Sequence, residues 1–195
     1  MAYYINNDVL RNCIATYNAN NIHDKLEWVP KYVEKFQKQF DKGKISKEEY
    51  DVILAFIKKK LDTRREVLDK YQAMTPAEKI CFEKELDATK TELYGYFNKI
   101  VVGRANSLYI HKDPALDPDE VRDIITDSII TLFNYSNRYD TDRGTSTFCY
   151  FTEVATNAIK GGINDVKARK EVLVTGCDFL DNMESGSNEQ DYDYD

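Results

Sequence analysis

Residues 117–136 read DPDEVRDIITDSIITLFNYS and contain a clear set of helix signals. Asp117 is a preferred helix N-cap, Pro118 suits the first helical position, and Glu120 completes a capping box three residues after the cap. Apolar residues then recur every three or four positions, as on the buried face of an amphipathic helix: Val121, Ile124, Ile125, Ile129, Leu132 and Phe133. The stretch predicts a helix that starts at Asp117 and ends near Ser136.

The residues that follow predict a turn and a second helix. Residues 138–144, RYDTDRG, are rich in turn formers. Residues 145–147 can cap a last helix that reaches about Lys170, with Gly161 and Gly162 as a weak point. A turn is expected at Gly176. From Glu184 onward there is no apolar period, which predicts a disordered acidic tail.

Helix signals also dominate upstream, and strand signals are nearly absent. Apolar spacing and capping residues predict helices over about 7–18, 30–43, 46–71 and 75–108. The short link 73–75 between the last two predicts an antiparallel helical hairpin. This hairpin is either a partner-binding coiled coil or a helix pair packed for its own sake. The fold class is therefore all-α.

The first helix of the hairpin carries five bases close together: Lys58, Lys59, Lys60, Arg64 and Arg65. Two interpretations are open. The cluster contacts nucleic acid, or it forms a solvated face of i,i+4 ion pairs. The acids at 62, 66 and 69 that are interleaved with it favour the second interpretation.

The 195 residues include 27 Lys and Arg against 34 Asp and Glu, a formal net charge of −7. Seven acids and no base follow Cys177, so residues 1–177 are neutral and the tail holds the whole excess. No run of about 20 apolar residues is present for a membrane helix, and the start lacks a signal-peptide pattern. We therefore expect a soluble, cytoplasmic protein with no membrane attachment.

Sequence motifs for catalysis or metal binding are missing. The four cysteines, at 13, 81, 149 and 177, form no close pair, and His23 and His111 lie ten or more residues from any of them. A zinc site would need closer thiols or paired histidines. No Gly-rich phosphate loop or nucleophile elbow occurs either. We expect no enzymatic activity, no cofactor and no metal.

Two neighbouring segments carry opposite charge. Residues 117–142 hold seven acids and two bases, a balance of −5, whereas residues 143–170 hold five bases and two acids, a balance of +3. Helices of opposite sign predict two different partners. For the first segment, a solvated acidic face is the alternative.

The span from Asp123 to Ile159 resembles region 2 of bacterial sigma factors, the transcription-initiation subunits of RNA polymerase. The resemblance runs without a gap through an acidic helix, the turn Tyr139-Asp140-x-x-Arg143-Gly144 and an aromatic helix around Tyr150. Residues 3–10, YYINNDVL, and the run 167–171, KARKE, sharpen it toward the small late-transcription sigma factors of large tailed phages. It covers roughly the first 20 residues and 100–180.

The resemblance implies a region 2-like domain formed by residues 1–27 and 100–177, a helical hairpin insertion at 28–99, and an acidic tail at 178–195. It also implies binding to the bacterial RNA polymerase core and recognition and melting of a −10 promoter element at phage late promoters. The acidic helix would bind the clamp helices of the largest polymerase subunit. Its polymerase-binding residues would be Asp119, Glu120, Asp123, Thr126, Asp127 and Asn134.

The basic aromatic helix would face the −10 element. Tyr150 lies where the family's base-stacking tyrosine lies, and stacking an extruded base on a ring offsets the cost of opening the duplex. Three aromatic residues within four helical positions cannot all face DNA, so we expect at least one in the core. The implied DNA-binding residues are Arg143, Phe148, Tyr150, Phe151, Asn157, Lys160, Lys167, Arg169 and Lys170.

The chain departs from the family where the duplex fork is opened. Glu153 and Val154 replace a tryptophan pair, and Thr145 and Thr147 replace two aromatic residues. These replacements predict weak unaided melting and dependence on a coactivator.

The start of the tail resembles a short motif with which those phage proteins bind the DNA sliding clamp, at Asp178, Phe179 and Leu180. Alternatively, this segment is a helix end whose Phe179 packs into the body. For the whole chain, the alternative function is a helical adaptor, or an anti-sigma-like modulator of polymerase, without promoter-specific DNA binding.

Overall fold

The computed structural model describes residues 5–23, 26–141 and 145–185, with side chains up to Val172. Within these residues the chain is helical and contains no strand, which confirms the predicted all-α class. The elements in chain order are α1 (Asn7–Asn20), α2 (Trp28–Asp41), α3 (Lys47–Ala73), α4 (Pro76–Ser107), the 3₁₀ turn η1 (Ile110–Lys112), α5 (Pro118–Ser136) and α6 (Thr147–Ser185). None of the described helices is both long enough and apolar enough to cross a membrane.

Helix starts follow the local capping residues closely. Asp117 accepts hydrogen bonds from the N–H groups of Asp119 and Glu120, and the Glu120 carboxylate accepts from the Asp117 N–H. The same reciprocal pair forms before α3 and before α4. After the C-terminal end of α2, Gly43 has a φ of 63° and stops the helix. These boundaries are as the sequence predicts.

The start of α1 differs from the prediction by one residue. Asn6, rather than Asn7, is the N-cap, and its Oδ1 accepts from the Asp8 N–H at 2.9 Å. Asn7 instead turns toward α6, where its Oδ1 accepts from the Phe148 N–H at 3.0 Å. The first helix therefore caps the last one.

The hydrophobic core is formed by α1, α4, α5 and α6. Phe97 at its centre is fully buried, and its ring lies 5.1 Å from Phe133 and 5.0 Å from Phe151 between centroids. The core also includes Leu86 and Leu93, so it extends well across the domain boundary that the resemblance implies at residue 99. α4 from Leu86 onward thus packs in the core and is not part of a separate helical hairpin.

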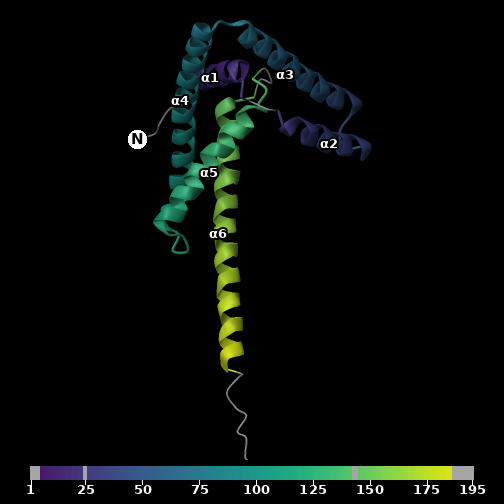
Figure 1. The fold of residues 1–195 in the computed structure, drawn as a ribbon. Coiled ribbons are helices and arrows are strands. Elements are labelled where there is room, and N and C mark those ends of the chain that lie inside the picture. Colours follow the sequence, from purple (N-terminus) through teal and green to yellow (C-terminus); the bar gives the residue numbers. More distant parts are fainter. Residues whose placement is uncertain (1–4, 24–25, 142–144, 186–195) are drawn as a thin grey trace, which may run out of the picture.

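The two long helices α3 and α4 do not form the predicted hairpin. They meet at their shared corner, where the rings of Tyr71 and Phe82 lie 5.7 Å apart, and then diverge (Figure 1). α3 pairs instead with α2, through stacked rings of Phe40 and Tyr50 at 5.0 Å. The sequence prediction was wrong here because the length of a link does not set the angle between two helices. We call residues 28–73, which form α2 and α3, the arm.

α6 is longer than the sequence predicts. It runs past Lys170, without a turn at Gly176, to Ser185, and its last turns extend beyond the other helices (Figure 1). Gly162 lies inside this helix, and an added Cβ there would meet Ile124 of α5 at 3.1 Å. The glycine therefore permits a close approach of α5 and α6. Most of the predicted disordered tail, 186–195, lies outside the described residues.

Candidate functional site

α5 presents one acidic face to solvent. Positions three or four residues apart fall on the same side of a helix, and Asp123, Thr126 and Asp127 follow this spacing. Ile130 continues it and is 52% exposed, although sequence reasoning missed it as a candidate. Its position seven residues after Asp123 was the available signal. The exposed residues of this acidic face are Asp119, Asp123, Thr126, Asp127, Ile130 and Asn134.

Within the part of the chain that the structure describes, the polar groups of the acidic face interact only with their own helix. Asp119 pairs with Arg122 at 3.0 Å, and both side chains are largely exposed. The Thr126 hydroxyl donates to the Arg122 carbonyl within the helix. An exposed pair of this kind contributes little to stability. The face is therefore available to a basic partner, with an apolar side chain at its middle.

Glu120 belongs to a different environment from the rest of the predicted polymerase-binding set. Its carboxylate accepts from the Asp117 N–H at 2.9 Å and from the Lys170 ammonium at 2.7 Å. Backbone hydrogen bonds to Glu120 and Asp119 hold the pKa of the Asp117 carboxyl below its usual range. Glu120 thus holds the start of α5 against α6.

Lys167 and Lys170 also interact within the chain. Lys167 pairs with Asp113 at 2.9 Å, and its hydrogen bond lowers the pKa of the Asp113 carboxyl. Lys170 donates to the Ala115 carbonyl as well as to Glu120. Both lysines were predicted to contact phosphate, yet the structure uses them to fasten α6 to the link before α5. Arg169 between them is exposed.

Tyr150 lies half-buried beside other aromatic rings. Its ring is 4.8 Å from Tyr139 and 5.1 Å from Phe151, between centroids. Burial, helped by the nearby hydroxyls of Tyr135 and Tyr32, raises the pKa of the Tyr150 hydroxyl to about 12. The shift reflects how closely the Tyr150 hydroxyl is packed, since a tyrosine is neutral at physiological pH with or without it.

The other two aromatic candidates point elsewhere. Phe151 is 0% exposed, and Phe148 is half-buried against the core. On a helix, Phe148 lies almost opposite Tyr150, because two residues correspond to about 200° of rotation. Phe151 therefore belongs to the core, and Phe148 does not share the face of Tyr150. Thr147 is buried, and its Oγ1 lies 3.1 Å from the Tyr139 hydroxyl.

Asn157 and Lys160 are exposed on α6. Asn157 follows Tyr150 by seven residues, so the two share a face, whereas Lys160 lies further round the helix. Arg143 lies outside the described residues. The side chains of Asp178, Phe179 and Leu180 do too, although their backbone continues α6.

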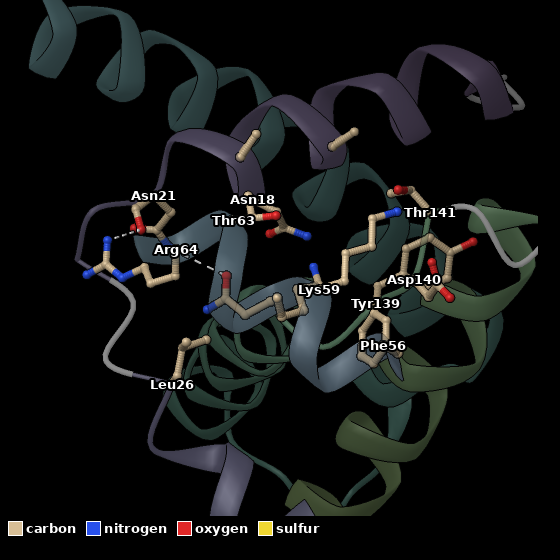
Figure 2. Close-up of a pocket in the computed structure, with 14 residues that line it drawn as sticks. Asn18, Asn21, Leu26, Phe56, Lys59, Thr63, Arg64, Tyr139, Asp140 and Thr141 are labelled. Carbon is tan, nitrogen blue, oxygen red and sulfur yellow. Dashed lines mark hydrogen bonds between the residues drawn. The ribbon is translucent and has the colours of Figure 1, made fainter. Parts of the chain in front are cut away.

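A pocket lies between the arm and the core (Figure 2). The sequence did not predict it. It has a volume of about 160 Å³ and lies between α1, α3 and the connector after α5. Arg64 of α3 lines it and donates to the carbonyls of Asn21 and Ile22 just after α1. Lys59 and Lys60 line it as well. Lys58 and Arg65, the other two bases of the α3 cluster, do not line the pocket.

The N-terminal end of α2 is anchored beside the same connector. The Arg138 guanidinium lies 5.8 Å from the ring of Trp28 and 5.4 Å from that of Tyr135. Trp28 is buried by this contact and by the ring of Tyr32 at 5.3 Å. The arm is therefore held against the core at two places, one on α2 and one on α3.

Comparison of the chain with protein-family models, curated proteins and solved structures gives no match.

Positions that resemble sigma region 2 differ in exposure. Leu132, Tyr139 and Ile159 are buried, so packing alone explains their residue types. Asp123 and Asp127 are exposed, and packing does not explain them.

Proposed function

We propose that the chain is a sigma factor that binds bacterial RNA polymerase core and directs initiation at phage late promoters, in the host cytoplasm. The observation that carries the proposal is the exposure of Asp123, Thr126 and Asp127 on one face of α5. These residues resemble the polymerase-binding positions of sigma region 2. An acidic helix face with no structural role of its own is well suited to a basic partner helix.

The acidic face supplies both steering and contact area. Its carboxylates accelerate encounter with a basic surface, an effect that weakens with salt. Ile130 supplies an apolar centre, which is where the binding energy of an interface concentrates. The polymerase clamp helices are the proposed partner, bound through Asp119, Asp123, Thr126, Asp127, Ile130 and Asn134.

Tyr150 is the proposed stacking surface for a base of the −10 element. Its inner side is held by Tyr139 and Phe151, which fixes the ring before DNA arrives. Stacking of one base on such a ring contributes about 1–3 kcal/mol. Asn157 on the same face is placed to contact a base edge or a phosphate.

Lys167 and Lys170, two of the bases on α6 that were expected to contact phosphate, are paired with Asp113 and Glu120. Affinity for DNA comes largely from neutralised phosphates. The free protein should therefore bind promoter DNA weakly, and productive binding should need polymerase. A coactivator, together with a sliding clamp bound through the segment 178–180, is proposed to compensate for the missing tryptophan pair at Glu153 and Val154.

Transcription reconstituted with host core polymerase tests the proposal, on a candidate late promoter with and without the sliding clamp. Reversal of the acidic face in Asp123→Lys/Asp127→Lys should abolish core binding. The matched control Asp51→Lys/Asp87→Lys reverses two exposed acids outside the face and should bind normally. Absence of core binding by the wild type, or core binding without promoter-specific transcripts, would refute the sigma assignment.

Variants of Tyr150 test the proposed role in promoter opening. Tyr150→Ala should reduce promoter opening and leave core binding intact, whereas Tyr150→Phe should retain opening because the ring remains. Tyr94→Ala removes an exposed tyrosine of α4 and serves as the control. Permanganate footprinting of the −10 region measures opening. Loss of core binding in Tyr150→Ala would show that its packing role had been mistaken for DNA binding.

A second function, a helical adaptor or anti-sigma-like modulator, is favoured by the arm. Its α3 exposes Leu54 at 38% and Leu61 at 42%, which are seven residues apart and therefore share one face. Single exposed apolar residues are ordinary, but two on one face of a helix provide a surface for a protein partner. An adaptor would bind polymerase and form no open complex, so the footprint separates the two functions.

A further inference from the structure

The start of the arm is held against Arg138, a base that lies beside the proposed stacking residue. The Arg138 guanidinium is 5.8 Å from the ring of Trp28 in α2 and 5.4 Å from that of Tyr135 in α5. Burial raises the pKa of the Tyr150 hydroxyl, and the charge of Arg138 opposes this rise, so the guanidinium lies near that hydroxyl. Tyr32, one helical turn after Trp28, lies near it as well. The arm therefore reaches the hydroxyl edge of Tyr150.

The contact between Trp28 and Arg138 leaves hydrogen-bonding groups unused. Trp28 is 8% exposed. Its indole Nε1 and the Nε of Arg138 are both buried, and neither has a hydrogen-bond partner in the part of the chain that the structure describes. A cation over an aromatic ring is attracted to it, whereas a buried donor without an acceptor costs free energy. The contact is therefore attractive but opposed by two unsatisfied donors.

The backbone at the start of α2 also favours release. Leu26, two residues before the helix, has a φ of 51°, in the left-handed region that a non-glycine residue adopts only with strain. Glu27, at the N-cap, makes no side-chain hydrogen bond to the first turn of the helix. The first N–H groups of the helix are therefore not held by their cap residue. A strained residue and an uncapped first turn lower the cost of moving the helix start.

The second attachment of the arm is firmer. The Arg64 guanidinium donates to the carbonyls of Asn21 and Ile22, and hydrogen bonds from a charged donor are the stronger kind. Both carbonyls come before Leu26 in the chain, so this attachment can persist while the start of α2 moves. Arg64 is thus placed to act as a pivot, and Trp28 as a latch that opens and closes.

We propose that the contact of Trp28 with Arg138 is an autoinhibitory latch, which holds the arm at the edge of Tyr150 in the free protein and is released when a single DNA strand binds at Tyr150. This inference rests on the proposed function and gives the arm a part in it. A protein whose binding-competent form is only partly populated shows an affinity reduced by that fraction. The latch therefore adds a second reason for weak DNA binding by the free protein, besides the ion pairs of Lys167 and Lys170.

Trp28 is the only tryptophan in the chain, so its fluorescence reports the latch without a label. In the wild type, acrylamide should quench this buried residue poorly. Arg138→Ala removes the guanidinium and should shift the emission to longer wavelength and increase quenching. Phe40→Ala is the matched control, because it removes the ring stack of α2 with Tyr50 of α3 and leaves the latch intact. Unchanged emission and quenching in Arg138→Ala would overturn the latch.

Fluorescence anisotropy with a labelled single-stranded oligonucleotide measures the consequence for DNA, on the full chain at low salt. A length of about ten nucleotides lies within the range that single-strand binding modules cover. Trp28→Ala should bind about tenfold more tightly than the wild type, which corresponds to about 1.4 kcal/mol. Trp28→Phe keeps a ring beside the guanidinium and should bind much like the wild type, as should Phe40→Ala. Thermal unfolding followed by circular dichroism establishes that each variant is folded.

Saturating oligonucleotide added to the wild type should release Trp28 and raise its quenching by acrylamide. If Trp28 stays equally buried in the DNA complex, or if Trp28→Ala binds no more tightly than the wild type, the latch is overturned and the stacking role of Tyr150 still stands. A gain in Phe40→Ala as large as that in Trp28→Ala would also overturn it, because general loosening of the arm would explain both.

Absence of oligonucleotide binding in the wild type and in every variant would overturn the latch and the stacking role of Tyr150 together. None of these measurements needs polymerase. Failure of transcription reconstitution thus leaves them readable, and failure here leaves polymerase binding by the acidic face standing.

Discussion

Replacement of Asn7 by alanine should destabilise the far end of the chain. Asn7 is the first residue of α1, yet its Oδ1 accepts from the Phe148 N–H at 3.0 Å and from the Ser146 hydroxyl at 3.2 Å. It is an N-cap supplied to α6 by a residue 141 positions earlier in the chain. Asn7→Ala removes that cap while α1 keeps its own cap at Asn6.

The loss in the free energy of unfolding depends on which capping bonds α6 keeps in Asn7→Ala. Loss of a helix N-cap costs about 0.5–2 kcal/mol. The Ser146 hydroxyl still accepts from the Cys149 N–H at 3.3 Å, so α6 keeps one local capping bond. We therefore expect a loss of about 1 kcal/mol in the free energy of unfolding, near the middle of that range. For a chain of this length, about 1 kcal/mol lowers the Tm by roughly 2–4 °C.

Asn7→Asp provides the matched variant. It keeps an acceptor at the same place and adds a negative charge at the N-terminus of α6, which typically contributes about 0.3–1 kcal/mol. Urea unfolding followed by circular dichroism measures both variants, and an unchanged m-value shows that midpoints can be compared. Asn12→Ala, an exposed change in the same helix, is the control.

Two results would refute the cap. One is an Asn7→Ala variant as stable as Asn12→Ala, and the other is an Asn7→Asp variant as unstable as Asn7→Ala.

Three further changes have defined outcomes. Phe97→Ala empties the centre of the core and should cost about 3–5 kcal/mol, which urea unfolding would register as a large share of a typical total stability of about 5–15 kcal/mol. Asp113 and Asp117 have pKa values held below the ordinary 3.8, so their contribution to stability is present above that pH and is lost as the pH falls through the folded pKa. Asp113→Asn/Asp117→Asn should therefore lose stability less steeply than the wild type as the pH falls below 3.8, which thermal unfolding at a series of pH values measures. Burial, and then the charge of Glu92, raise the pKa of the Cys13 thiol to about 11. Alkylation of the native protein at pH 8, followed by mass spectrometry, should therefore label exposed Cys81 much faster than Cys13. Similar labelling rates for the two thiols would contradict the burial of Cys13.

Features that depend on neighbouring residues were predictable. The three capping boxes each need only four consecutive residues, as in Asp117 to Glu120, and all three form. Gly43 likewise ends α2 through its own backbone conformation. The helical class and most helix boundaries follow from such local signals.

Arrangements that depend on distant residues were not predictable. The apolar stripe of α3 was expected to pack against α4, but only Ile57 of that helix is buried. The apolar side of α4 at Leu86, Leu93 and Phe97 packs on the core instead. Periodicity shows that a helix has an apolar face and does not show which other face covers it.

In the candidate site, too, the local features were predictable and the long-range contacts were not. The exposure of Asp123 and Asp127 follows from the helix period alone. The ion pairs of Lys167 with Asp113 and of Lys170 with Glu120 join residues about fifty positions apart, and no local pattern encodes them. The pocket is assembled from α1, α3 and the connector, so its lysines looked like part of an ordinary solvated face.

α4 is a single uninterrupted helix of 32 residues, which at 1.5 Å per residue is about 48 Å long. One half is clamped in the core around Phe97, and the other reaches the corner with α3. The same helix therefore connects the corner with the arm to Phe97, whose ring packs on Phe151 next to Tyr150. A partner bound at the corner would act on the helix that supports the proposed stacking residue from behind.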